Sequence, residues 1–373
     1  MYGGNGRSYR TSRGGGGGIG GGNGGSNGIG GGIGGAGSSA TKGDAEVRFA
    51  GLELEQAESQ YSALAKDQHG CRFLQRKLEE GGAHAATLIL NEVVARFSEL
   101  MTDPFGNYLC QKLLEHVSDS QKTEILKSVS SDLAFVSLNM HGTRAVQKLV
   151  EHVSNAAQAS LLVQALGPHT VKLIKDLNGN HVVQKCLVRL APADAQFIFD
   201  AVTAQCVEVS THRHGCCVIQ RCLDYASPDQ RRRLAGEITT HALSLVKDPF
   251  GNYVVQYVLD MGDPMFVDAI AARLRGNVVD LSMQKFASNV MEKCMRVASP
   301  DLRRLLIAEL YAVPLTLDNL LRDGYANYVI QSSIDYIDMH QRAVLLDRLS
   351  PLIPLIRNTP YGKRIMAKLN LMY

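Results

Sequence analysis

Eight sets of three polar residues recur along the chain, and their types suit flat, hydrogen-bonding ligands. In each set the first residue is small and can hydrogen-bond, the second is mostly flat, and the third is Gln or Glu. An amide can donate and accept in one bidentate pair, whereas a carboxylate only accepts. We call each set a trio. The trios are Cys71, Arg72 and Gln75; Asn107, Tyr108 and Gln111; Thr143, Arg144 and Gln147; Asn180, His181 and Gln184; Cys216, Cys217 and Gln220; Asn252, Tyr253 and Gln256; Ser288, Asn289 and Glu292; and Asn327, Tyr328 and Gln331.

The trios are evenly spaced. Successive third positions are 36, 36, 37, 36, 36, 36 and 39 residues apart. A period of this length indicates a stacked-repeat architecture. The pattern therefore predicts one long solenoid where length alone would suggest two domains.

Each trio fits one face of a helix. With the first residue at position i, the others fall at i+1 and i+4, within an arc of roughly 100°. Positions i+2, i+3, i+6 and i+7 lie opposite and are apolar in most copies, for example Val254, Val255, Val258 and Leu259; Lys77 and Ser333 are exceptions. We expect helices with a packed apolar back and a polar front.

Local signals refine these helices. Asp103-Pro104 and Asp248-Pro249 predict helix starts, with Asp as N-cap and Pro as the first helical residue. Gly stands before the trio in six copies, which allows either close approach of a ligand to the backbone or tight packing between repeats. The last step of 39 residues predicts a small insertion around residues 311–317.

The N-terminal segment differs from the rest. Residues 1–44 hold 21 of the 36 glycines, and we predict that they are disordered, as a flexible linker or as a Gly/Arg segment with weak RNA attraction. We expect an N-terminal cap at 45–64, repeats at about 65–352 and a C-terminal cap at 353–373. In that cap, Ala367 stands where Gln or Glu is expected.

Charge gives no direct sign of a nucleic-acid partner. The net charge is +3, and residues 45–373 carry 35 basic and 35 acidic residues. A positive field must therefore come from charge segregation, and Lys112, Lys148, Lys185 and Arg221, all at i+5, are placed to flank the polar front. The sequence has no secretory signal and no apolar run of 18 residues, so we expect neither export nor a membrane partner. We therefore expect the eight cysteines to be free, in a reducing compartment.

The trios resemble those of the Pumilio (PUF) family of RNA-binding proteins, over about residues 45–373. The resemblance implies an all-α fold: a right-handed α-solenoid, an armadillo-like superhelix of eight three-helix repeats with a cap at each end. It implies that single-stranded RNA lies antiparallel on the concave face, one base per repeat. The first and third trio residues would contact a base edge and the second would stack between bases.

The family's code then implies an element close to 5′-UGUAUAUA-3′. Glu292 suits the N1 and N2 donors of guanine, and Gln suits uracil beside Asn or adenine beside Cys, Ser or Thr. Cys217 stands where the family often has Arg, so the fourth base would be loosely held, substituted or turned outward. Thr143 is also less usual, and a spare base could lie nearby.

The resemblance also implies a cellular role. We expect a cytoplasmic monomer that binds 3′-untranslated elements of messenger RNA and brings in deadenylase or translation-repression proteins, with no cofactor and no catalytic residues.

A zinc site, an enzyme and a protein-binding scaffold are the other hypotheses for this sequence. His212, His214, Cys216, Cys217 and Cys222 are close in sequence and could suggest zinc, but Cys222 falls on the apolar side of its helix. An enzyme is disfavoured because no phosphate loop, carboxylate pair or activated nucleophile is present. An armadillo- or HEAT-like scaffold for protein partners is the main alternative, although such arrays do not repeat Asn-Tyr-x-x-Gln.

Overall fold

The computed structural model describes residue 49, residues 51–312 and residues 314–370. The predicted tail, residues 1–44, and the first residues of the predicted N-terminal cap lie outside this part of the chain. Contacts divide the chain into residues 1–48 and a unit of residues 49–373, and only the second is described below. Its secondary structure, over the residues described, is helical.

Three kinds of helix alternate along this unit. Short lead helices come first in each repeat: α2 (Tyr61–Ala65), α4 (Phe97–Thr102), α7 (Leu133–Leu138), α10 (Thr170–Lys175), α13 (Cys206–Ser210), α16 (Ala242–Leu245), α19 (Val278–Ser282), α22 (Pro314–Arg322) and α25 (Ile353–Ile356). Trio helices follow: α3 (Gln68–Val93), α5 (Gly106–His116), α8 (Gly142–Glu151), α11 (Gly179–Arg189), α14 (Gly215–Tyr225), α17 (Gly251–Asp260), α20 (Ala287–Val297), α23 (Ala326–Tyr336) and α26 (Pro360–Asn370). Outer helices complete the repeats: α6 (Asp119–Val129), α9 (Ala156–Leu166), α12 (Gln196–Ala204), α15 (Pro228–Thr240), α18 (Pro264–Leu274), α21 (Pro300–Leu310) and α24 (Met339–Leu349).

The first repeat combines two of these roles in α3. Gly82 has φ 54° and ψ −130°, so the helix breaks there into a trio half and an outer half. Such a backbone conformation carries little penalty for Gly because it has no Cβ. The first repeat thus has the same three-helix plan as the others.

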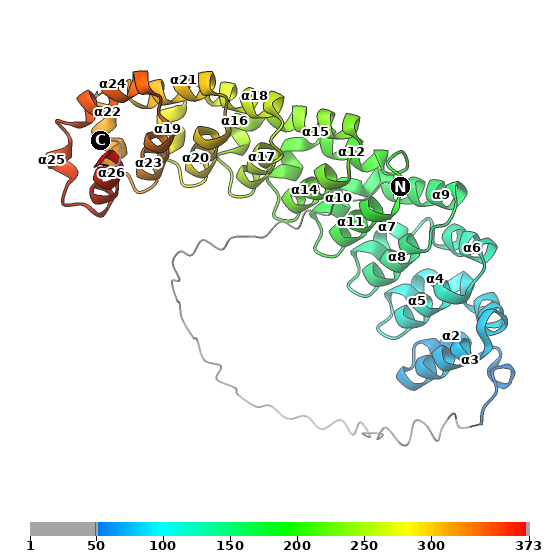
Figure 1. Ribbon diagram of the computed structural model, residues 1–373. Helices are drawn as coiled ribbons and strands as arrows, with labels where there is room; N and C mark the ends of the chain where they lie inside the picture. The colour runs from blue at the N-terminus through cyan, green and yellow to red at the C-terminus, as the bar shows by residue number, and fades with distance from the viewer. Residues whose placement is uncertain (1–48, 50, 313, 371–373) are drawn as a thin grey trace, which may run out of the picture. The chain divides into compact units, whose positions relative to one another are not determined.

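Equivalent helices of successive repeats pack side by side. The trio helices contact one another in an unbroken series from α3 through α5, α8, α11, α14, α17, α20 and α23 to α26. Within this unit they lie along the inner side of a curve, and the outer helices lie along the opposite side (Figure 1). The predicted all-α solenoid of three-helix repeats is confirmed.

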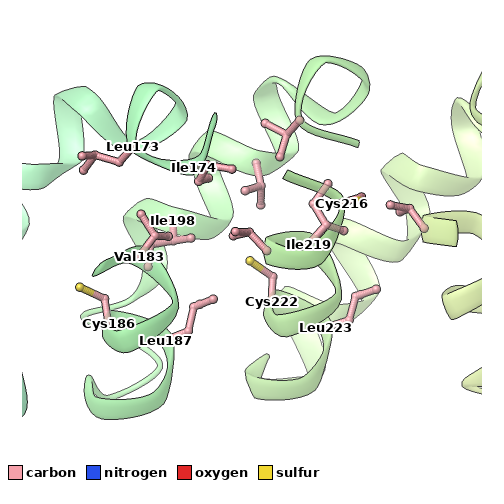
Figure 2. Packing of buried hydrophobic residues seen from close by; sticks show 14 of the residues in the cluster. Leu173, Ile174, Val183, Cys186, Leu187, Ile198, Cys216, Ile219, Cys222 and Leu223 are labelled. Atoms are coloured by element: carbon pink, nitrogen blue, oxygen red, sulfur yellow. The ribbon is translucent and has the colours of Figure 1, made fainter. Parts of the chain in front are cut away.

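Residues of the predicted apolar slots form the core between repeats. Val254, Val255, Val258 and Leu259 are all buried, and so are their counterparts in the second to seventh repeats. Figure 2 shows this layer at α11 and α14, with Cys186 and Cys222 in equivalent places. Burying each such side chain contributes about 1.5–3 kcal/mol. Cys186 and Cys222 therefore serve as small hydrophobic residues.

The two irregular copies have local solutions. Lys77 reaches out to Glu53 at 2.8 Å. Ser333 is buried, lies 2.7 Å from the Tyr311 hydroxyl and donates to the Ile330 carbonyl. Both polar side chains therefore have partners, which removes most of the cost of placing them in apolar slots.

The extra residues of the last step belong to a lead helix. α22 spans 9 residues whereas α4 spans 6. The predicted insertion at 311–317 thus includes the start of this longer helix.

Candidate nucleic-acid interface

All eight trios lie on the trio helices, and their three positions differ in burial in a constant way. First positions are buried, second positions are exposed, and third positions are half-buried except Gln331, which is 9% exposed. The trio helices stand in one row along the inner side of the curve (Figure 1), so the trios recur from one helix to the next, and we call the eight trios together the polar strip. Of the predicted polar front, the second positions lie on the surface, whereas the first positions are buried.

In the Asn-containing trios, the first and third residues are hydrogen-bonded to each other. Gln111 Nε2 donates to Asn107 Oδ1 at 3.0 Å, and the same bond joins Gln184 to Asn180, Gln256 to Asn252 and Gln331 to Asn327 at 2.9–3.0 Å. Asn107 Nδ2 in turn donates to the backbone carbonyls of Asp103 and Pro104. The Asn side chain is thereby fixed, and the Gln amide keeps one N–H and its carbonyl oxygen for a ligand.

Two other trios use a hydroxyl or a thiol in the same way. Gln147 donates to Thr143 Oγ1 at 3.1 Å, and Gln75 donates to Cys71 Sγ at 3.2 Å. Thr143 donates to the Asn178 carbonyl, which precedes the next trio helix. Cys71 makes the equivalent bond to the Phe105 carbonyl. These first positions therefore also join neighbouring repeats.

The seventh trio has different chemistry. Glu292 Oε2 accepts a hydrogen bond from Ser332 of the next repeat at 3.4 Å. Burial raises the pKa of the Glu292 carboxyl, while the Ser332 hydrogen bond lowers it by a smaller amount. When ionised, this side chain only accepts, so it suits a ligand edge with two donors.

The fifth trio is built from two thiols. Cys216 is buried and donates to the Arg213 carbonyl at 3.5 Å, and its sulfur lies 3.9 Å from that of the exposed Cys217. Burial, followed by charge repulsion from Cys217, raises the pKa of Cys216 to about 12. Cys216 is therefore a neutral thiol at physiological pH. His212 Nδ1 accepts from the backbone N–H of His214, and in the part of the chain described no three His, Cys, Asp or Glu side chains converge as metal ligands would.

The second trio positions frame open slots. Tyr108 and Tyr253 are 58% and 57% exposed. Between the first two repeats a cleft of about 390 Å³ is lined by Arg72 and Tyr108 together with Cys71, Gln75 and Phe105. A planar group in this cleft would have flat side chains on both sides and the hydrogen-bonding pair at its edge.

In six repeats an Asp or Asn side chain four residues before the trio helps to hold its helix. Asp103 Oδ1 accepts from the N–H groups of Phe105 and Gly106 at 2.8 Å, and Asp248 does the same for Phe250 and Gly251. The predicted Asp N-caps are wrong in position, because the N-cap residues are Phe105 and Phe250, although the Asp side chains do bind N–H groups at the helix starts. The helices begin at Gly106 and Gly251, however, so Pro104 and Pro249 lie in the preceding turn and are not the first helical residues.

The glycine before the trio is explained by packing. A Cβ on Gly251 would lie 2.8 Å from the Leu245 carbonyl oxygen, and one on Gly215 would lie 2.1 Å from that of Val209. Both carbonyls belong to the lead helix of the same repeat. The tight contact is therefore within a repeat, between lead and trio helices.

Three of the four basic residues expected to flank the polar front, the lysines at i+5, do not form a free positive field. Lys148 lies 2.8 Å from Glu115 of the preceding repeat, Lys112 lies 3.0 Å from Glu79, and Lys185 lies 2.5 Å from Glu151. Lys293 and Lys368 make the same contact with Asp260 and Asp335. We call this series the ion-pair ladder. Its acidic partners stand at i+8 with the period of the trios, a signal that the sequence carries and that was missed.

Comparison with known proteins identifies the family to which these repeats belong. The model of the Pumilio-family RNA-binding repeat matches eight times, at residues 60–94, 96–130, 134–166, 169–203, 205–239, 241–274, 277–311 and 321–350. The chain belongs to the Pumilio family. Each matched segment contains one trio.

Pumilio relatives align over most of the chain. A Pumilio domain-containing protein of Schizosaccharomyces pombe is 50% identical over 320 residues, which cover 86% of this chain and 46% of that protein. Pumilio homology domain family member 4 of Saccharomyces cerevisiae is 43% identical, over 87% of this chain and 37% of that protein. The chain thus spans less than half the length of these two relatives.

Solved Pumilio structures share the fold. The Puf4 RNA-binding domain, bound to an HO endonuclease RNA 3′ UTR recognition sequence, matches with a TM-score of 0.71 and 45% identity, over 82% of this chain and 98% of that one. The yeast Puf5p domain bound to AAT2 RNA matches with a TM-score of 0.75 and 32% identity, over 84% of this chain and 96% of that one. Pumilio proteins bind RNA and are not enzymes. Across the described residues, no helix is long and apolar enough to span a membrane.

Proposed function

We propose that this chain binds single-stranded RNA through its polar strip, one base per repeat, with an element close to 5′-UGUAUAUA-3′. The observation that carries the proposal is the constant architecture of the trios: eight consecutive repeats have a buried first residue and an exposed second residue, and the third residue is half-buried in all but the eighth, where Gln331 is buried. Pumilio relatives have been solved with recognition sequences from 3′ UTRs, which supports the same ligand class here.

Hydrogen bonding in the last three repeats supports the first three bases. Gln331 and Gln256, each held by its Asn partner, offer one donor and one acceptor, which match the N3–H and O4 groups of uracil. Glu292 offers acceptors only, which match the N1–H and N2–H groups of guanine. By analogy with base contacts in DNA, each good bidentate pair discriminates by about 1–3 kcal/mol.

The exposed second residues support stacking. Tyr108, Tyr253 and Tyr328 are exposed. Stacking on such side chains contributes about 1–3 kcal/mol per base without sequence preference. Affinity would therefore come mainly from the second positions and specificity from the first and third.

A cellular role follows as part of the proposal. Binding at 3′-untranslated elements in the cytoplasm would repress or destabilise messenger RNA through recruited effector proteins. Relatives have been solved with 3′ UTR recognition sequences, which supports binding at 3′-untranslated elements.

A binding competition tests the proposal against the protein-scaffold alternative. Affinity of the full chain for UGUAUAUA is compared with affinity for ACUAUAUA, in which the first two bases are changed, at one fixed salt concentration. We expect the second RNA to bind at least about tenfold more weakly, because two base contacts are lost. Equal affinities would contradict sequence-specific binding and favour the scaffold.

A further inference from the structure

The fifth repeat has no flat side chain at its second trio position. Cys217 is exposed but offers only a thiol, whereas the other repeats place Arg, Tyr, His or Asn there. A base held by Cys216 and Gln220 would therefore have little to stack on from its own trio.

The same repeat interrupts the ion-pair ladder. In the preceding rung, Lys185 is held by Glu151 at 2.5 Å. The next rung would join Arg221 to residue 188, but that residue is Val188, which has no charge. Arg221 keeps only a 3.6 Å contact with Asp224 on its own helix, and its side chain is 55% exposed.

The acid beside Arg221 is already engaged. Asp224 accepts a hydrogen bond from the Tyr257 hydroxyl of the next repeat, which occupies the i+5 place in the sixth repeat. The pKa of Tyr257 is raised to about 12, first by this hydrogen bond and then by burial, so its proton stays on the phenol. Arg221 therefore occupies the i+5 position of the fifth repeat without an acidic partner from the fourth repeat.

Helix geometry brings Arg221 to the vacant stacking place. Arg221 and Cys217 are four residues apart on α14, so their side chains are neighbours on one face. In this structure the Arg221 guanidinium turns toward Asp224, on the C-terminal side, and this exposed contact is weak enough for the side chain to turn toward Cys217 when a base is bound. A guanidinium is flat and cationic, stacks on aromatic rings and binds phosphate.

We propose that Arg221 supplies the stacking contact to the base of the fourth nucleotide that Cys217 cannot make. This inference rests on the proposed function and adds a residue outside the trios to the interface. The ladder also lacks an ion pair between the seventh and eighth repeats, where its two positions hold Arg296 and Ser332. The second trio positions of these two repeats are Asn289 and Tyr328. Among the described repeats, a missing stacking side chain and a missing rung coincide in the fifth.

The primary test measures RNA affinity of Arg221→Ala, with Lys185→Ala as the matched control one repeat earlier. We expect Arg221→Ala to weaken binding of UGUAUAUA by about fivefold to a hundredfold, the range for one base stack. Lys185 is half-buried and already paired with Glu151, so it is not free to contact RNA and its removal should change affinity by no more than about threefold. The inference is overturned if Arg221→Ala binds the RNA as tightly as wild type does. It is also overturned if Arg213→Ala weakens RNA binding and Arg221→Ala does not.

Two further measurements separate stacking from a structural role. An RNA with an abasic nucleotide at the fourth position should bind wild type and Arg221→Ala equally, because the base that Arg221 contacts is absent. Adding Cys217→Arg to Arg221→Ala should restore affinity for the intact RNA. If the defect persists on the abasic RNA and Cys217→Arg does not restore binding, Arg221 acts only on the fold and the inference fails. The proposed function itself fails separately, if wild type does not prefer UGUAUAUA over ACUAUAUA.

Discussion

Gln256 donates its Nε2 hydrogen to Asn252 Oδ1 at 2.9 Å, one helical turn away on α17. Asn252 is 1% exposed and its own amide donates to the carbonyls of Asp248 and Pro249. The pair is therefore organised before any ligand arrives, which lowers the entropy lost on binding. The same arrangement in the second, fourth and eighth repeats makes the polar strip a preformed surface.

Asn252→Ala tests this organisation in the sixth repeat. The substitution releases Gln256, so binding of an RNA with uracil at the third position should weaken by about 1–3 kcal/mol. Binding of an RNA with cytosine at that position should change much less, because the wild-type contact is already lost. Fluorescence anisotropy with both RNAs gives the two differences, and equal losses for the two bases would contradict base-edge recognition by this pair.

The seventh repeat should exchange its base preference when its trio is exchanged. Ser288→Asn together with Glu292→Gln converts an acceptor-only edge into a donor–acceptor edge like that of Asn252 and Gln256. We expect preference at the second base to move from guanine to uracil. Competition among four RNAs that differ only at this base measures the change, and an unaltered preference for guanine would refute the assigned contacts.

Burial of Glu292 predicts a pH dependence of stability. The folded chain holds the proton to a higher pH than the unfolded chain, because burial raises the pKa above its usual 4.5. Stability from the neutral carboxyl is thus present at pH below 4.5 and is lost as pH rises through the raised pKa. Glu292→Gln should therefore unfold at a higher temperature than wild type at pH 7, with the difference shrinking toward pH 4. A constant difference across this range would contradict the burial argument.

The packing explanation for the glycines gives a matched pair of variants. Gly251→Ala places a methyl 2.8 Å from the Leu245 carbonyl oxygen, so lead and trio helices must separate, at a cost of about 1–3 kcal/mol. Gly236 lies within α15, and a methyl group added there would meet nothing within 4 Å, so Gly236→Ala should stabilise by about 0.4–1 kcal/mol. Urea unfolding measures both, and a stabilising Gly251→Ala would show that the contact relaxes freely.

Much of the fold was predictable because its signals are local and repeated. Val254 and Val255 indicate the apolar face of a helix from its local sequence. The recurrence of this pattern in eight copies at one period indicates that the repeats stack. The side-chain bonds were less accessible. Lys148 looked like a free cation because its partner, Glu115, is 33 residues away in sequence and one repeat away in space.

Backbone details were also partly beyond the sequence. Asp103 and Pro104 indicate a helix start, but the turn between the capping side chain and Gly106 depends on contact with the lead helix. The constraint on Gly106 comes from the Leu100 carbonyl, which the sequence alone does not place. Local chemistry thus predicted which residues matter, and tertiary packing decided where each helix begins.

The ion-pair ladder predicts that removing an acid raises RNA affinity. Glu115 holds Lys148 at 2.8 Å and Lys112 at 3.2 Å, and the Lys148 hydrogen bond, which opposes the smaller effect of burial, lowers the pKa of its carboxyl. Glu115→Gln releases the Lys148 ammonium group beside the polar strip, while Lys112 stays paired with Glu79. Affinity for UGUAUAUA should rise at low salt, and the dependence of affinity on salt should steepen by about one phosphate contact. Glu124→Gln removes the same charge from the exposed surface of α6, away from the trios, and should leave the salt dependence unchanged. Equal slopes for wild type and Glu115→Gln would show that the ladder lysines do not reach the RNA even when released.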